Sequence, residues 1–243
     1  MARMVRRRVS DGEDKEIAKT MCGRFTLFDS SDSLAERFGL GEATSLSPRY
    51  NIAPSQAVAV VRIPAEGADR ELALLRWGFV PSWAKDPSVG SRMINARAET
   101  APEKPAFRAA IRRRRCLVPA DGFYEWKHAG GRKQPYYVRM RDGGTFAFAG
   151  IWEIWKGEGG DPIESCALLT TGPNELLEPI HDRMPVIIPP GGYDLWLSPM
   201  VHDPSALIPF FAPYPAGEMT AYPVRTLVNN PKMDEPALIE PLH

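Results

Sequence analysis

The sequence predicts a single α+β domain in which short helices flank a curved, barrel-like antiparallel β-sheet core. Two observations predict this fold class. The middle of the chain alternates short apolar runs with glycine-containing turns, and closely spaced hairpins imply antiparallel pairing because parallel strands need longer crossovers. In addition, neither an internal repeat nor a linker divides the chain after residue 21. A chain of 243 residues is long enough to bury a substantial core.

The first elements are a helix and two strands. The helix begins near Ser31 or Asp32, either of which can cap it, and Gly39 suits its end. Leu34, Ala35 and Phe38 form its apolar face. Strands are expected at residues 57–63 and 72–80, followed by a short helix at 106–113.

The middle and the end of the chain are rich in β signals. Strands are expected at 116–119, 122–127, 135–140, 145–151 and 165–171, with turns at 129–131, 142–144 and 157–162. Short helices are expected at 175–180, 193–197 and 204–211, and strands at 184–188 and 219–225.

The composition is that of a soluble globular protein, with 44% hydrophobic and 25% charged residues. No apolar run approaches the ~18 residues of a membrane span, so no membrane partner is expected. Three cysteines, an odd count, argue against a disulfide framework and favour a reducing, cytoplasmic location. The formal net charge of zero gives no support to nucleic-acid binding, although residues 112–115 are all arginine and form either a solvated helix end or part of a basic groove.

Residues 1–20 are polar, mixed in charge and without an apolar face, so they are neither a secretory signal nor a transit peptide. Met4 and Met21 are alternative starts. We expect residues 1–21 to be a leader or an incorrectly assigned start that the active form lacks, and residues 22–243 to be the working domain.

Three residues could carry chemistry, each with a structural alternative. Cys22 precedes a probable strand, where an inert buried cysteine is commoner, and Cys116 and Cys166 fit that alternative well. Glu125 lies among aromatic residues. It is either one partner of a surface salt bridge or a partly buried acid–base group. His181 lies in a loop, either solvated or suited to proton transfer near neutral pH. The other histidines (His128, His202 and His243) are expected to be surface residues.

Two further groups could bind a nucleotide. Asn95 and Arg97 are two residues apart and face the same way in an extended segment, where they could orient a phosphate or sugar, or tie down a loop. Trp77, Phe79 and Trp83 could stack on bases or pack in the core.

Taken together, several segments resemble the SRAP family (SOS response-associated peptidase), whose members process abasic sites in single-stranded DNA. The matching segments are MCGRFT at 21–26, RYNIAP at 49–54, WGFVPSW at 77–83, INARAET at 94–100, CLVPADGFYEW at 116–126, LLTT at 168–171 and HDRMPV at 181–186. Their order and spacing cover roughly residues 21–228. One position that is basic in the family is Pro105 here, with Lys104 beside it.

The resemblance implies the SRAP fold and a covalent trap for abasic DNA. The cysteine after the initiator methionine, Cys22 here, attacks the ring-opened aldehyde and forms a stable thiazolidine. The family's other catalytic residues fall on Asn95, Glu125 and His181. Its DNA contacts fall on Arg24, Asn51, Pro54, Trp83, Arg97, Thr170 and Arg183.

The resemblance also implies a monomer associated with the nucleoid that needs no metal or organic cofactor. Lyase and self-cleaving peptidase activities are expected beside the crosslink. Two other functional hypotheses fit the sequence. Cys22 could be the N-terminal nucleophile of a peptidase or amidohydrolase, with its own amine as the base. Alternatively, the arginines and tryptophans could form a non-catalytic module that binds single strands.

Overall fold

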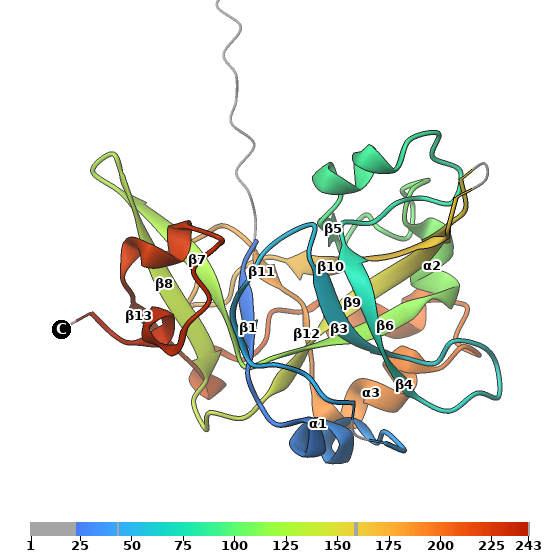
Figure 1. Cartoon of the computed structure of the whole chain (residues 1–243), viewed down its shortest axis with the longest axis horizontal. Helices are drawn as coiled ribbons and strands as arrows, with labels where there is room; N and C mark the ends of the chain where they lie inside the picture. Colours follow the sequence, from blue (N-terminus) through green and yellow to red (C-terminus); the bar gives the residue numbers. More distant parts are fainter. Residues whose placement is uncertain (1–22, 43, 158–159, 243) are drawn as a thin grey trace, which may run out of the picture.

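The computed structural model describes residues 23–42, 44–157 and 160–242 (Figure 1). The expected leader, residues 1–21, and Cys22 lie outside the described residues.

Five strands close into a barrel. They are β3 (Ala57–Arg62), β4 (Glu71–Trp77), β6 (Arg115–Ala120), β9 (Phe146–Trp155) and β10 (Ile163–Thr171). Each pairs with its neighbour in the order β10-β4-β3-β6-β9, and β9 pairs again with β10 to complete the ring. The expected barrel-like core is therefore confirmed.

The expectation of antiparallel pairing holds for most of these strands and is wrong at two pairs. β10 runs parallel to β4 and parallel to β5 (Asn95–Arg97). A parallel pair needs a long connection, and the intervening strands and α2 (Arg108–Arg113) supply it. Three short strands extend the sheet, because β5 and β11 (Met184–Pro185) pair with β10 and β12 (Ile187–Ile188) pairs with β9.

A second sheet lies beside the barrel and has the order β13-β8-β7-β1-β2 (Figure 1). Its strands are β1 (Phe25–Leu27), β2 (Arg49–Ile52), β7 (Gly122–Ala129), β8 (Arg132–Met140) and β13 (Met219–Pro223). β7 and β8 form a long hairpin whose turn is Gly130-Gly131. Both glycines have positive φ, as the two central residues of a type I′ turn require.

The helices are short, as expected. α1 (Ser31–Phe38) is capped by Ser30, one residue before the predicted cap, and ends at Gly39 in the left-handed conformation. α3 (Tyr193–Leu197) has the predicted bounds, whereas residues 204–211 form a 3-10 helix.

The helix expected at 175–180 is wrong. These residues form turns, in which the Asn174 side chain accepts the backbone N–H of Leu177 at 3.0 Å. Pro179 has no N–H with which to continue a helical ladder, so the turns lead directly into the loop that carries His181.

Aromatic side chains fill the space between the two sheets. Phe25 packs edge-on against Trp77 and Phe148, with ring centroids 5.2 and 5.7 Å apart. Trp77 and Phe79 are fully buried, so the core alternative is the correct one for both. Cys116 and Cys166 are also buried, as expected, and burial raises the pKa of the Cys166 thiol to about 12.

The arginine block at residues 112–115 divides between solvent and core. The first two side chains are exposed, and Arg114 forms an ion pair with Glu153 at 2.6 Å. Arg115 is buried and donates to the carbonyl of Trp196 at 2.7 Å, and burial lowers its pKa to about 10. Half of the block therefore stabilises the fold.

Candidate functional site

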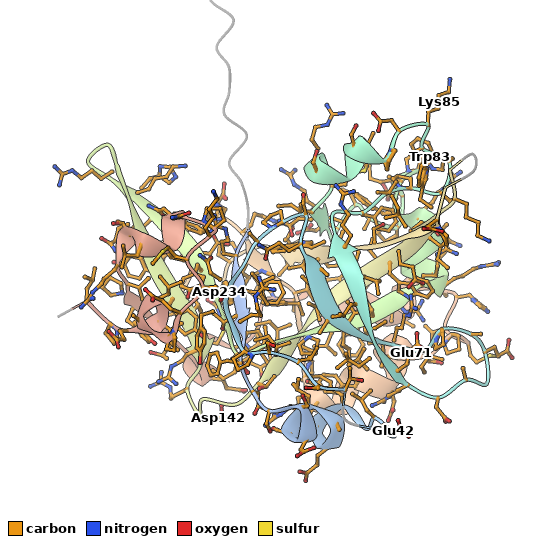
Figure 2. All side chains as sticks on the ribbon, viewed as in Figure 1. Glu42, Glu71, Trp83, Lys85, Asp142 and Asp234 are labelled. Atoms are coloured by element: carbon orange, nitrogen blue, oxygen red, sulfur yellow. The ribbon has the colours of Figure 1, made fainter. Side chains whose placement is uncertain are left out.

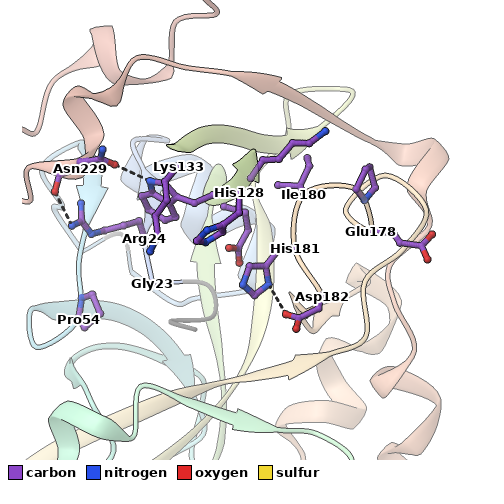
Figure 3. A pocket seen from close by; sticks show the side chains of 14 residues that line it. Gly23, Arg24, Pro54, His128, Lys133, Glu178, Ile180, His181, Asp182 and Asn229 are labelled. Atoms are coloured by element: carbon purple, nitrogen blue, oxygen red, sulfur yellow. Dashed lines mark hydrogen bonds and ion pairs between the residues drawn. The ribbon is translucent and has the colours of Figure 1, made fainter. Parts of the chain in front are cut away.

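A cavity of about 820 Å³ lies where the start of β1, the β7–β8 hairpin and the loop after β10 meet (Figure 3). Four residues singled out from the sequence line it: Arg24, Pro54, Glu125 and His181. Gly23, the residue that follows Cys22, lines it as well. Segments more than 150 residues apart in the sequence, at residues 23 and 181, thus face one space.

The pairing of β1 with β7 places Arg24 beside Tyr124, the residue before Glu125. Phe25 pairs with Phe123, and the N–H of Tyr124 donates to the Arg24 carbonyl at 3.0 Å. Glu125 follows directly and is only 1% exposed, which rules out the surface salt bridge. A carboxyl group at a cavity wall and shielded from bulk water is suited to moving protons.

His181 is held by its own loop. Its Nδ1 accepts the backbone N–H of Arg183 at 3.1 Å and lies 3.3 Å from Oδ1 of Asp182. The imidazole side chain is 8% exposed, so the solvated alternative is wrong. Nδ1 also lies 3.2 Å from the carbonyl oxygen of Arg183, so the loop holds the ring through Nδ1.

Arg24 is fixed by the C-terminal part of the chain. Its guanidinium donates to Oδ1 of Asn51 at 2.8 Å and to the carbonyl of Val228 at 2.6 Å. Burial lowers the pKa of the Arg24 guanidinium. Asn51 is fully buried, and its amide also donates to the carbonyls of Asn230 and Met233. A direct contact between Asn51 and DNA does not fit this burial, and Asn51 instead positions Arg24.

We call residues 226–239 the C-terminal strap. The strap holds β2 through Asp234, whose carboxylate accepts the N–H of Tyr50 at 2.5 Å and of Asn51 at 3.1 Å and pairs with Arg49 at 2.5 Å (Figure 2). The strap also accepts the Trp126 indole N–H through Asn229, at 2.7 Å. The strap therefore holds both β2 and Trp126, a residue that lines the cavity.

The Asp234→Asn protein is expected to lose about 1–2 kcal/mol of unfolding free energy, because the amide breaks the ion pair with Arg49 and one acceptor becomes a donor. Urea denaturation measures the loss. Glu235→Gln is the matched control, since Glu235 is the exposed neighbouring acid and its variant should stay within about 0.5 kcal/mol of the wild type. Equal stability of the two variants would show that the strap does not hold β2 through Asp234.

A second group of the predicted residues lies on β5 and β10. Asn95 pairs with Leu168 and Arg97 with Thr170, which sets Asn95 and Arg97 on the same strand face. Arg97 is exposed, whereas Thr170 is buried, so a direct contact between the Thr170 side chain and DNA does not fit. The Thr170 carbonyl accepts from Arg183 at 2.6 Å.

Arg183 joins this group to the His181 loop. Its two terminal nitrogens donate to the two carboxylate oxygens of Glu99 at 2.6 and 2.8 Å. The hydrogen bond with Arg183 holds the pKa of Glu99 below its usual value, against the opposing effect of its partial burial. Since the folded-state pKa is lowered, the pair is complete above about pH 4.5 and is lost as pH falls through the lowered value.

Trp83 lies on the loop after β4 and is 66% exposed, near the exposed Lys85 (Figure 2). It is the one member of the aromatic group 77–83 that presents its ring to solvent, and it can stack.

Several cavity residues were not predicted as site residues: Trp126, Lys127, His128, Lys133, Glu178, Asp182 and Asn229. His128 is exposed, as expected, but it also lines the cavity. Trp126 stands beside Glu125 in the segment CLVPADGFYEW, and this position was the available signal for Trp126.

Neither a metal group nor a membrane span is found in the part of the chain that the structure describes. No cluster of three or more His, Cys, Asp or Glu side chains there could hold a metal ion. No helix within the same residues is long and apolar enough to cross a bilayer.

The barrel, the second sheet and the cavity define a member of the SRAP family, and the chain belongs to it: the family model for SOS response associated peptidase matches residues 21–231. Among its relatives, the abasic site processing protein YoqW of Bacillus subtilis (strain 168) is 46% identical over 224 residues, covering 90% of this chain and 99% of YoqW. The abasic site processing protein HMCES of Mus musculus is 31% identical over 234 residues, covering 80% of this chain and 65% of HMCES.

Solved structures agree with the fold. The crystal structure of a protein from Bacteroides thetaiotaomicron has a TM-score of 0.82 at 26% identity and covers 91% of this chain and 100% of that one. The family resemblance and the fold class are therefore both confirmed.

Proposed function

We propose that this protein processes abasic sites in single-stranded DNA by forming a covalent thiazolidine through an N-terminal Cys22. The observation that supports this best is the cavity in which Glu125 and His181 converge beside Gly23, the residue that follows Cys22. The names of the relatives, all abasic site processing proteins, agree with the substrate. Arg24 and Pro54 at the same cavity, and the more distant Arg97, Arg183 and Trp83, are proposed to contact the strand.

The chemistry takes place in two bond-forming steps. The α-amine of Cys22 attacks the ring-opened aldehyde, and loss of one water leaves an imine. The thiolate then adds to the imine carbon while the nitrogen takes up a proton, which closes a five-membered ring. Reference pKa values of about 7.7–8.0 for an α-amine and about 8.5 for a thiol make both groups partly reactive near neutral pH.

Glu125 and His181 divide the proton transfers. Abasic deoxyribose is mostly a closed hemiacetal, and His181 assists its opening through Nε2, because its Nδ1 contacts the loop. Glu125 moves protons at the imine from a wall that is closed to bulk solvent. Asn95 hydrogen-bonds the sugar or the Cys22 amine. The imine also allows β-elimination of the 3′ phosphate, which is the proposed lyase side reaction.

This reaction requires that residues 1–21 be absent. With Met21 attached, the Cys22 nitrogen is an amide and cannot form an imine. We expect removal through Met21, by self-cleavage or because translation starts at Met21. Intact-mass measurement of the purified native protein tests this, and a dominant species that retains Thr20 would contradict the mechanism.

One gel experiment separates the proposal from its rivals. The mature protein is incubated with single-stranded oligonucleotides with and without one abasic site and is then run under denaturing conditions. A slow band with the abasic strand alone supports the trap. Binding without a covalent band favours a single-strand binding module, and peptide turnover without DNA reactivity favours an N-terminal nucleophile hydrolase.

The Glu99→Gln protein is expected to bind single-stranded DNA several-fold more tightly at pH 7. Glu99 is ionised there and occupies both terminal nitrogens of Arg183, so it competes with any phosphate for that guanidinium. Fluorescence anisotropy at several salt concentrations measures the change, and the log–log slope should steepen by about 0.7 for one added phosphate contact. Glu103→Gln, which changes an exposed acid of the same loop, serves as the control. Unchanged affinity in Glu99→Gln would mean that Arg183 does not contact the strand.

A further inference from the structure

The β7–β8 hairpin is strongly basic in a chain whose formal net charge is zero. Residues 126–141 contain no Asp or Glu and five cations, which are Lys127, Arg132, Lys133, Arg139 and Arg141. Since the 30 basic residues of the whole chain balance 30 acidic ones, this segment is a local excess of positive charge.

Part of this positive charge lies at the cavity. The register pairs Lys127 with Gln134, His128 with Lys133 and Ala129 with Arg132, next to the Gly130-Gly131 turn. Lys127, His128 and Lys133 line the cavity. We call Lys127, His128, Arg132 and Lys133 the basic hairpin end.

The opposite wall of the cavity carries negative charge. It is formed by the loop after β10, from which Glu178 and Asp182 line the same cavity. Figure 3 shows Arg24, Lys133 and His128 toward one side of the cavity and Glu178 and Asp182 toward the other. The electrostatic potential is therefore more positive on the hairpin side of the cavity, and this favours anions there.

A structural role in ion pairs is the alternative explanation for a basic hairpin, but two features argue against it. His128 and Lys133 are directly opposite each other, an arrangement that repels when both are charged. In addition, none of the ion pairs found among the described residues joins Lys127, Arg132 or Lys133 to a carboxylate. The cations are thus available to a ligand at the cavity rather than committed to the fold.

We propose that the DNA phosphates on one side of the reacting nucleotide run along the basic hairpin end, while Glu178 and Asp182 keep the strand off the opposite wall. The cavity then binds the phosphates on one side of the abasic site more strongly than the phosphates on the other side. This inference rests on the proposed function, because it assigns a strand path to the same site.

The test uses two single-stranded oligonucleotides with a tetrahydrofuran abasic analogue, which has no aldehyde and cannot crosslink. One carries the analogue at its 5′ end and the other at its 3′ end. Each oligonucleotide therefore has nucleotides on only one side of the analogue. Dissociation constants are measured by fluorescence anisotropy from low to high salt for the wild type, Lys133→Ala, Lys127→Ala and Lys133→Arg.

We expect Lys133→Ala to flatten the log–log salt slope by about 0.7 with one of the two oligonucleotides and to leave the other unchanged, because one phosphate contact is lost on one flank. Lys127→Ala should affect the same oligonucleotide, and Lys133→Arg should keep the wild-type slope since it keeps the charge. Lys156→Ala, which removes an exposed lysine outside the cavity, should change neither.

Equal flattening with both oligonucleotides, or with neither, would overturn the proposal. The outcome is separable from that of the proposed function, because crosslinking is assayed with the true aldehyde substrate. A wild type that crosslinks but shows no flank preference contradicts the strand path alone. A wild type that shows the preference but never crosslinks contradicts the trap alone.

Discussion

The Cys22→Ala protein, with its N-terminus at residue 22, is expected to form no stable complex with abasic single-stranded DNA. Alanine retains the α-amine, so the imine still forms, but no thiol is present to close the ring. The imine hydrolyses, and the denaturing gel should show free DNA. Cys22→Ser should behave in the same way, because a hydroxyl gives a labile ring.

Borohydride makes this prediction specific. It reduces an imine to a stable amine, so both variants should regain a covalent band when the reductant is present. Cys116→Ala is the matched control: it removes a buried thiol outside the cavity and should crosslink without reductant, as the wild type does. A stable band in Cys22→Ala without borohydride would place the nucleophile elsewhere and reject the thiazolidine.

The Glu125→Gln protein is expected to form the crosslink about 10²–10⁴ times more slowly than the wild type, the range for loss of a general acid–base group. Glutamine keeps the shape and the hydrogen-bonding capacity of the side chain but cannot exchange a proton. Because Glu125 is only 1% exposed, bulk water cannot readily take over its role. Single-turnover time courses with saturating protein measure the rate.

Glu103→Gln is the matched control for Glu125→Gln, since Glu103 is an exposed carboxylate outside the cavity. Its crosslinking rate should stay within a few-fold of the wild type. Thermal melting of both variants establishes that they are folded. A folded Glu125→Gln protein that reacts at the wild-type rate would mean that Glu125 only shapes the cavity.

Local patterns predicted most of the elements, because each element depends on residues close in sequence. The strand expected at 122–127 is β7, Gly122–Ala129, and α3 begins and ends where it was predicted. Gly39 ends α1 because a left-handed residue is needed there. The parallel pairing of β10 was missed because strand pairing depends on contacts between distant segments, which local patterns do not record.

The candidate site was predicted less fully, and mainly through family resemblance. Spacing alone left Glu125 and His181 with structural alternatives. Burial excludes a surface salt bridge for Glu125 and a solvated side chain for His181. The burial of Asn51 and its bond to Arg24 link residues 27 positions apart, and no local pattern could show this. The basic hairpin was visible as charge, but its place at the cavity depends on a loop about 50 residues further along the chain.

The C-terminal strap has a consequence for the order of events during synthesis. Arg24 is held by the carbonyl of Val228, 204 residues later in the chain. At 5–20 residues per second, the ribosome adds Val228 about 10–40 s after Arg24. A nascent chain therefore exposes its N-terminal part well before Val228 is available to hold Arg24. Products of premature termination lack the strap altogether, so a partly made chain is not expected to capture DNA as the finished protein does.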